Sequence, residues 1–108
     1  MDMVKQYEIY FVNLDPTVGA EVKKTRPCVI ISPDELNKFL NTVIIAPITS
    51  TIRNYPTRLD LILQKRNGQI MLDQIRAIDK SRLHSKITSL DTTNVSKLKS
   101  IIQEMLVD

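Results

Sequence analysis

The chain has 108 residues and a mass of 12.4 kDa, which is enough for one modest hydrophobic core and a single domain over residues 1–108. Its 43% hydrophobic and 25% charged residues are typical of a globular protein and exclude a disordered chain. No apolar stretch reaches the roughly 20 residues that a membrane-spanning helix needs, so the sequence predicts no membrane association.

The N-terminus and the cysteine content indicate where the protein works. Charges at Asp2, Lys5 and Glu8, with no long apolar segment after them, argue against a signal peptide. The single cysteine, Cys28, cannot form an intrachain disulfide, and its apolar neighbours predict an inert, buried thiol. Together these features predict a cytoplasmic protein.

The net charge of +3 is unevenly distributed along the chain. Residues 22–59 contain six basic and two acidic side chains, a balance of +4, which leaves −1 for the rest of the chain. Such an excess of cations suits a polyanionic ligand. A solvated basic face is the commoner reading of such a cluster, so the charge alone favours nucleic acid only weakly.

The first half of the chain predicts two strands separated by a long loop. Residues 7–14 are rich in aromatic and β-branched side chains, which favours a strand, and residues 15–19 begin a loop with turn-forming types. Residues 27–32 form a continuous apolar run, which predicts a strand buried on both faces.

A short helix is expected next. Ser32 is predicted as its N-cap, Pro33 as its first residue and Glu35 as the partner in a capping box, and the helix should end near Phe39. Several short strands follow, at residues 43–46 (stopped by Pro47), 58–63, 69–72 after an Asn67-Gly68 hairpin turn, 76–79 and 86–90.

The C-terminal segment changes to helical periodicity. Its apolar residues recur at helical spacing after a possible cap at Asp91 or Thr92; they are Val95, Leu98, Ile101, Ile102 and Met105. Many short strands with one short and one terminal helix predict a mainly β protein with helices (α+β), a small, partly open barrel on which the helices pack.

Chemically useful side chains stand at the ends of two predicted strands. Glu21 and Arg26 flank the start of the second strand, and Thr49 and Ser50 follow the third. A carboxylate, a guanidinium and two hydroxyls at one end of a small sheet can bind and polarise a phosphodiester without a metal. Cys28 and a single histidine, His84, cannot build a zinc site, so no metal and no other cofactor is expected.

His84 also cannot serve as the histidine pair of the familiar ribonuclease arrangement, because it is the only histidine in the chain. We therefore interpret it as a surface or strand-edge residue.

Several ordered blocks of the sequence resemble the MazF/PemK toxins. The N-terminal signature lies in residues 8–21 and 25–34, and later blocks match at residues 47–50 and 73–83. The resemblance covers essentially the whole chain. It implies an SH3-like barrel of the CcdB/MazF type with a C-terminal helix, and a homodimer. It further implies a metal-independent, sequence-specific endoribonuclease of a type II toxin–antitoxin system, which cuts single-stranded mRNA and is held inactive by a cognate antitoxin.

The resemblance also implies roles for individual residues. Arg26 matches the central catalytic arginine, for which stabilisation of phosphorane charge is the suitable role, since arginine hardly ever loses its proton. Thr49 matches a hydroxyl that donates to the scissile phosphate, and Ser50 is a weaker candidate for that role. Glu21 is either the general base or a charge partner of nearby cations such as Lys23, and the two readings stay open.

Further residues are expected to bind RNA. Tyr55 could stack on a base, while Asp73 and Gln74 present groups that read base edges. The other expected RNA-binding residues are Gly19, Lys23, Lys24, Ser50 and Arg53.

Two departures and two alternatives accompany this interpretation. The family often has serine where this chain has Ala20, and often has glycine in the loop that here carries Lys23 and Lys24. One alternative is a DNA gyrase poison like the CcdB proteins, which share the barrel; the absence of tryptophan near the C-terminus argues against it. The other is an SH3-like binding module without chemistry.

Overall fold

The computed structural model describes residues 3–14 and 25–107. In chain order its elements are β1 (Glu8–Asn13), β2 (Thr25–Ile30), α1 (Asp34–Phe39), β3 (Thr42–Thr49), β4 (Arg58–Leu63), β5 (Arg66–Met71), η3 (Leu72–Gln74), β6 (Arg76–Asp79), η4 (Lys80–Arg82), β7 (Leu83–Ser89) and α2 (Thr92–Leu106). None of the helices in these ranges is both long and apolar enough to cross a membrane.

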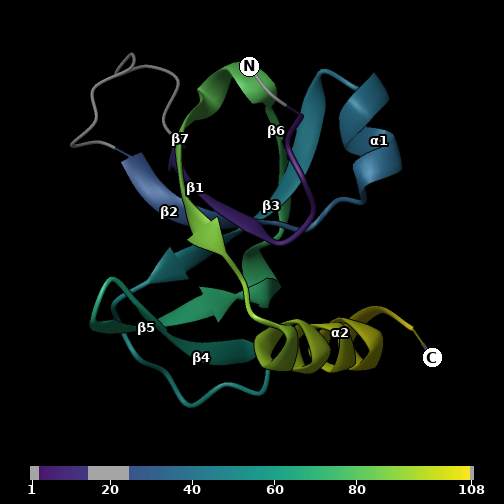
Figure 1. Ribbon diagram of the computed structural model, residues 1–108. Coiled ribbons are helices and arrows are strands. Elements are labelled where there is room, and N and C mark those ends of the chain that lie inside the picture. The colour runs from purple at the N-terminus through teal and green to yellow at the C-terminus, as the bar shows by residue number, and fades with distance from the viewer. Residues whose placement is uncertain (1–2, 15–24, 108) are drawn as a thin grey trace.

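The strands form one curled antiparallel sheet in the order β4-β5-β3-β2-β1-β7, with β6 paired to β3. Figure 1 shows β1, β2, β3, β6 and β7 curving around one half of the molecule, while the β4–β5 hairpin lies in the other half beside α2. The mainly β, partly open barrel with a C-terminal helix is therefore confirmed.

Two hydrophobic clusters lie on opposite sides of this sheet, because side chains alternate between its faces. In β1, Ile9 enters one cluster and Val12 the other; in β2, Val29 and Ile30 divide in the same way. The apolar run of β2 is therefore buried on both faces, as expected. Its Cys28 has no exposed surface, and burial raises the pKa of its thiol to about 12, so this thiol stays protonated and inert at neutral pH.

Helix α2 confirms the predicted helical periodicity. Leu98 is 1% exposed, and Ile101, Ile102 and Met105 pack against the same cluster that receives the inner face of β4. The carboxylate of Asp91 accepts a hydrogen bond from the backbone N–H of Asn94 at 2.8 Å, so Asp91 is the N-cap.

The interpretation that Pro47 stops the third strand is wrong, because β3 continues through it to Thr49. One edge of β3 pairs with β6 as far as Ile45 and with β5 from Ile48 onward. Pro47 lies where this edge changes partner, so a residue without an amide hydrogen is accommodated there.

The predicted turn at Asn67-Gly68 is also wrong, because both residues lie inside β5. The turn is formed instead by Gln64 and Lys65, with φ angles of 51° and 66°. Two successive positive φ values are the geometry of the two-residue hairpin turn that matches the twist of the strands. Gly68 has a different purpose: a β-carbon there would lie 3.0 Å from the carbonyl oxygen of Thr49.

The predicted capping box of α1 does not form. The N-cap is Pro33, and Ser32 instead joins α1 to β3: its hydroxyl donates to Asn37 Oδ1 at 2.5 Å and accepts from the N–H of Ile44 at 3.0 Å. The carboxylate of Glu35 makes no hydrogen bond with the part of the chain that the structure describes. The predicted end of the helix at Phe39 is correct.

The predicted limits of β4 and β6 are correct, and those of the other strands shift by one to three residues. β2 begins at Thr25 rather than residue 27, and β7 begins at Leu83 rather than residue 86. β1 begins only at Glu8, because Tyr7 has a φ of 71° that interrupts the extended backbone. His84 is exposed on β7, an edge strand, as expected.

Candidate active site

Antiparallel pairing brings the start of β2 to the end of β3. The register of β2 against β3 pairs Cys28 with Pro47 and Val29 with Ala46. Two positions further along both strands, the same register places Arg26 opposite Thr49. Residues 23 positions apart in sequence thus meet at one end of the sheet, which fulfils the expectation that these two side chains lie together.

A cleft of about 410 Å³ lies at this end of the sheet. Arg26 of β2 lines it together with Thr49 and Ser50 at the end of β3, and Phe11 of β1, further residues of β2 and β3 and the β4–β5 hairpin also line it. A guanidinium and two hydroxyls share this hollow with apolar surface, which is the composition of a ligand site with a few placed polar groups.

Arg26 is available to a ligand. It is exposed, and its guanidinium makes neither a hydrogen bond nor an ion pair with any other described residue. A guanidinium presents a planar fork of donors that fits two oxygens of a phosphate. The fork is therefore available to bind an anion in the cleft.

The hydroxyl of Thr49 is oriented by its own backbone. Its Oγ1 accepts a hydrogen bond from the backbone N–H of Thr51 at 3.1 Å. Because a hydroxyl carries one proton and two lone pairs, this contact uses a lone pair and leaves the proton free to donate into the cleft. Ser50 is exposed beside it and lines the same cleft.

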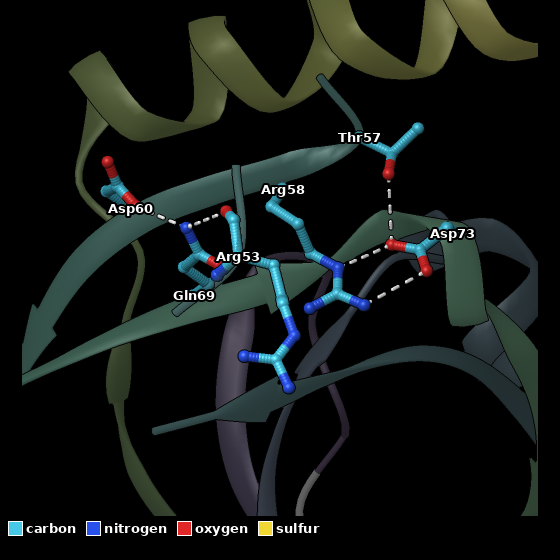
Figure 2. A network of polar contacts seen from close by, with 6 residues as sticks. All are labelled: Arg53, Thr57, Arg58, Asp60, Gln69 and Asp73. Carbon is cyan, nitrogen blue, oxygen red and sulfur yellow. Dashed lines mark hydrogen bonds and ion pairs between the residues drawn. The ribbon is translucent and has the colours of Figure 1, made fainter. Parts of the chain in front are cut away.

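A second group of polar residues covers the outer face of the β4–β5 hairpin, and we call it the hairpin network: Arg53, Thr57, Arg58, Asp60, Gln69 and Asp73 (Figure 2). Arg58 Nε donates to Asp73 Oδ1 at 2.8 Å and its Nη2 to Oδ2 at 3.3 Å, while the hydroxyl of Thr57 donates to Oδ1 at 3.1 Å. The hydrogen bond from Arg58 holds the pKa of Asp73 below its ordinary value, and the same bond raises the pKa of Arg58.

Gln69 anchors the loop between β3 and β4. Its side-chain Oε1 accepts from the backbone N–H of Arg53 at 3.0 Å, and its Nε2 donates to the carbonyl of Arg53 at 3.0 Å and to Asp60 Oδ1 at 2.8 Å. Gln69 is only 4% exposed, so these bonds satisfy a buried amide. It also pairs with Thr49 in the β3–β5 ladder, which connects the loop to the end of the cleft.

The other expected RNA-binding residues lie apart from the cleft or outside the described residues. Arg53 and Tyr55 are exposed in the β3–β4 loop, and the Tyr55 ring lies 4.9 Å from the guanidinium carbon of Arg58. Asp73 and Gln74 lie in η3 and do not line the cleft, and the Asp73 carboxylate is already bound to Arg58. Gly19, Glu21, Lys23 and Lys24 lie outside the described residues.

Among the cleft-lining residues that sequence reasoning did not identify are Phe11, Gln64, Arg66 and Asn67. Phe11 alternates with core residues in β1 and was indistinguishable from them by pattern. The other three lie in or next to a turn, where polar residues are ordinary. Only the return of β5 alongside β3 shows that this turn faces Arg26 and Thr49.

Side chains of the types that bind metals are scattered over the described residues rather than clustered. Within residues 3–14 and 25–107, no three of the histidine, cysteine, aspartate and glutamate side chains lie close enough together to hold an ion.

Comparison with known proteins gives a consistent result. Residues 5–106 match the family described as PemK-like, MazF-like toxin of type II toxin-antitoxin system. The chain is 38% identical over 107 residues to endoribonuclease EndoA of Bacillus subtilis, covering 94% of this chain and 92% of EndoA.

Two solved structures share the fold. MazF from Deinococcus radiodurans superposes with a TM-score of 0.80 at 20% identity, covering 98% of each chain. A mycobacterial endoribonuclease in complex with its cognate antitoxin gives 0.79 at 17% identity, covering 98% of this chain and 95% of the other. With a family match over nearly the whole chain and a relative well above 30% identity, the chain belongs to the PemK-like, MazF-like toxins of type II toxin–antitoxin systems and is an endoribonuclease of that family.

Proposed function

We propose that this toxin cuts single-stranded mRNA at a short sequence motif in the cytoplasm, without a metal, and that the reaction takes place in the cleft that Arg26 and Thr49 line. The observation that carries the proposal is that cleft: an unpartnered guanidinium and an oriented hydroxyl, 23 positions apart in sequence, line one hollow of about 410 Å³.

The proposed chemistry uses the nucleophile that RNA itself supplies. The 2′-oxygen attacks the neighbouring phosphorus and loses its proton to a base; the bond from phosphorus to the 5′-oxygen breaks, and that oxygen takes up a proton. The products are a 2′,3′-cyclic phosphate and a 5′-hydroxyl. Arg26 and the hydroxyl of Thr49 would donate to the non-bridging oxygens, whose charge grows in the transition state. Glu21 is the proposed base, and Ser50 the proposed second hydroxyl.

The test is cleavage of a mixed single-stranded RNA in EDTA by the wild type and by Arg26→Ala, with the new ends mapped. We expect wild-type cuts at one short motif with 5′-hydroxyl ends, and their loss in the variant. Arg82→Ala removes an arginine that lies in η4 and does not line the cleft, so it is the matched control and should cleave like the wild type.

Two other outcomes would count against the proposal. Cleavage that EDTA abolishes and Mg²⁺ restores would contradict a metal-independent mechanism. Equal cleavage by the wild type and Arg26→Ala would remove Arg26 from the reaction and with it the assignment of the cleft.

The proposed assembly is a homodimer. A single protomer leaves large apolar side chains uncovered, among them Phe39 at 78%, Ile62 at 73% and Leu106 at 68% exposure. A self-complementary contact through such surface is the commonest way for a small soluble protein to cover it. Sedimentation that shows only a monomer at micromolar concentration would contradict this.

The proposed inhibitor is a cognate antitoxin with an acidic, partly disordered segment. This segment would lie along the basic surface around the cleft and cover Arg26 and Thr49. Charge reversal at Lys23, Lys24 and Arg53 should then weaken antitoxin binding. Unchanged affinity of the triple variant would contradict an electrostatic contact at this surface.

A further inference from the structure

The side of the cleft formed by the β4–β5 hairpin carries three polar side chains, Gln64, Arg66 and Asn67. All three are exposed, and none of their side chains makes a hydrogen bond or ion pair with another residue in the described ranges. They offer two amides and a guanidinium to whatever occupies the cleft beside Arg26.

Neighbouring polar residues of the same hairpin show that this lack of partners is selective. Gln69, two positions after Asn67, is 4% exposed and bonded through both atoms of its amide. Asp60, on the adjacent strand, accepts from Gln69. Gln69 and Asp60 are thus bonded within the protein, whereas the three side chains that line the cleft beside Arg26 have no partner among the described residues.

The position of Asn67 relative to the reacting groups is fixed by the backbone. Gly68 follows it, and the strands approach so closely there that a β-carbon would lie 3.0 Å from the carbonyl oxygen of Thr49. Asn67 is also paired with Ile62 in the β4–β5 ladder. An amide mounted on paired strands beside Thr49 can discriminate between ligands, because it cannot move away to suit each of them.

Asn67 also stands between two hollows. A second cleft of about 430 Å³ shares Asn67 and Gly68 with the first, and the rest of its lining is Ile52, Asp60, Leu61 and Ile62. Ile52 and Ile62 are 53% and 73% exposed. Apolar surface next to an amide suits a nucleobase, which presents a flat face and a hydrogen-bonding edge.

We propose that the hairpin side of the cleft is a nucleotide-specificity site, in which the side-chain amide of Asn67 reads the edge of the base next to the scissile phosphate and Arg66 binds an adjoining backbone phosphate. An asparagine amide donates and accepts side by side, so it pairs best with a base edge that presents the same combination, as adenine does. Gln64 would provide a second amide at the outer end of the site. This inference rests on the proposed cleavage of single-stranded RNA in this cleft.

The experiment is cleavage of a pool of single-stranded RNA with randomised sequence, followed by sequencing of the cut ends. We expect Asn67→Ala to keep cutting but to lose roughly tenfold of its preference at one position of the motif. Asn67→Asp, which accepts but does not donate, should shift the preference at that same position toward a base whose edge donates, such as cytosine. Arg66→Ala should leave the motif unchanged and weaken RNA binding at all sequences. The slope of the logarithm of the binding constant against the logarithm of the salt concentration should become smaller by about one.

The matched controls are Asn41→Ala, an exposed asparagine away from both clefts, and Arg82→Ala. An Asn67→Ala motif identical to that of the wild type, or a uniform loss of cleavage at every sequence, would overturn the specificity site. If Asn67→Ala does not fold, an unchanged motif in Asn67→Asp would overturn it equally. A wild type that fails to cut, or an Arg26→Ala variant that cuts normally, would instead refute the proposed function.

Discussion

Two arginines of this small protein have opposite environments, although both lie at the start of a strand. Arg26 of β2 is exposed in the cleft, and its side chain makes no hydrogen bond or ion pair to the rest of the described chain. Arg58 of β4 has a side chain only 8% exposed, two hydrogen bonds to Asp73 and the ring of Tyr55 within 4.9 Å. Composition treats the two alike, whereas in the structure the guanidinium of Arg58 is bonded within the fold and that of Arg26 is left available to a ligand.

A similar contrast exists between two amides of β5. The buried amide of Gln69 is saturated by Arg53 and Asp60, while the exposed amide of Asn67 lines the cleft. A polar group that serves the fold has to be satisfied within the fold, because an unpaired buried group costs about 1–3 kcal/mol. A group that serves a ligand gains nothing from an internal partner, which it would have to break on binding.

The largest expected effect is on catalysis, at Arg26. Arg26→Ala should lower kcat by roughly 100- to 1,000-fold, the usual cost of removing one donor from a developing negative charge. The free energy of unfolding should change by less than about 0.5 kcal/mol, because the exposed side chain has no internal partner. Single-turnover cleavage and denaturant unfolding measure the two quantities. A large loss of stability would show that Arg26 serves the fold after all and would break the comparison.

Arg58 should show the reverse pattern. Arg58→Met keeps the buried stem but leaves Asp73 without its strongest partner, and we expect a loss of about 1.5 kcal/mol in unfolding free energy. Cleavage by the folded variant should stay within a few-fold of the wild type. A double-mutant cycle with Asp73→Asn isolates the pair, and additive effects of the two substitutions would show that the pair is not coupled.

Gly68 links the two regions, since its strand carries both Asn67 and Gln69. Gly68→Ala would force a β-carbon to 3.0 Å from the carbonyl oxygen of Thr49, so the strands must separate. The clash should outweigh the entropic benefit of alanine and cost about 1 kcal/mol of stability. Cleavage should also slow, because Thr49 shifts with its backbone. Unchanged kcat in a destabilised variant would show that the position of Thr49 does not depend on this contact.

The main elements of the fold were predictable because each depends on local pattern. The apolar run of β2 predicts a buried strand, and the helical spacing of Leu98, Ile101 and Ile102 predicts a helix with one apolar face. The structure contains both elements, packed in the same core cluster. The predicted strand end at Pro47 and the predicted turn at Asn67-Gly68 were wrong because tertiary strand pairing overrode the local preferences of proline and glycine. Pro47 lies where β3 changes partner, and Gly68 is required for close approach rather than for a turn.

The site was predictable only in part. Arg26 and Thr49 came from the family resemblance, and the register of β2 against β3 explains how they meet. The structural role of Asp73 was not visible, because its partner Arg58 is 15 residues away in sequence and the pairing exists only when η3 lies against the start of β4. Asn67 was hidden for the same reason: its position beside Thr49 is created by the hairpin.

The hairpin turn offers a smaller effect on stability. Gln64 and Lys65 both adopt positive φ, which costs an L-residue roughly 1 kcal/mol and glycine almost nothing. After the larger backbone entropy of glycine in the unfolded state is subtracted, Lys65→Gly should stabilise the protein by about 0.5 kcal/mol. Lys65 does not line the cleft, so thermal unfolding should shift upward while the cleavage motif stays unchanged. A fall in the melting temperature would show that the lysine side chain makes a contribution that outweighs the backbone cost.

The smallest expected effect is on the acid side of the stability curve. The hydrogen bond from Arg58 lowers the pKa of Asp73 from its ordinary value of 3.8, so the ionised carboxylate stabilises the native state. For a lowered pKa, this contribution is complete above the unfolded-state value and is lost as the pH falls through the lower native value, which places the loss below pH 3.8. Asp73→Asn should therefore be less stable than the wild type at neutral pH, and the difference should shrink as the pH falls through that range. Parallel stability curves for Asp73→Asn and the wild type would mean that the pKa of Asp73 is the same in the folded and the unfolded protein. The hydrogen bonds of the hairpin network would then not stabilise its ionised carboxylate, and Asp73 would resemble the unpartnered groups of the cleft.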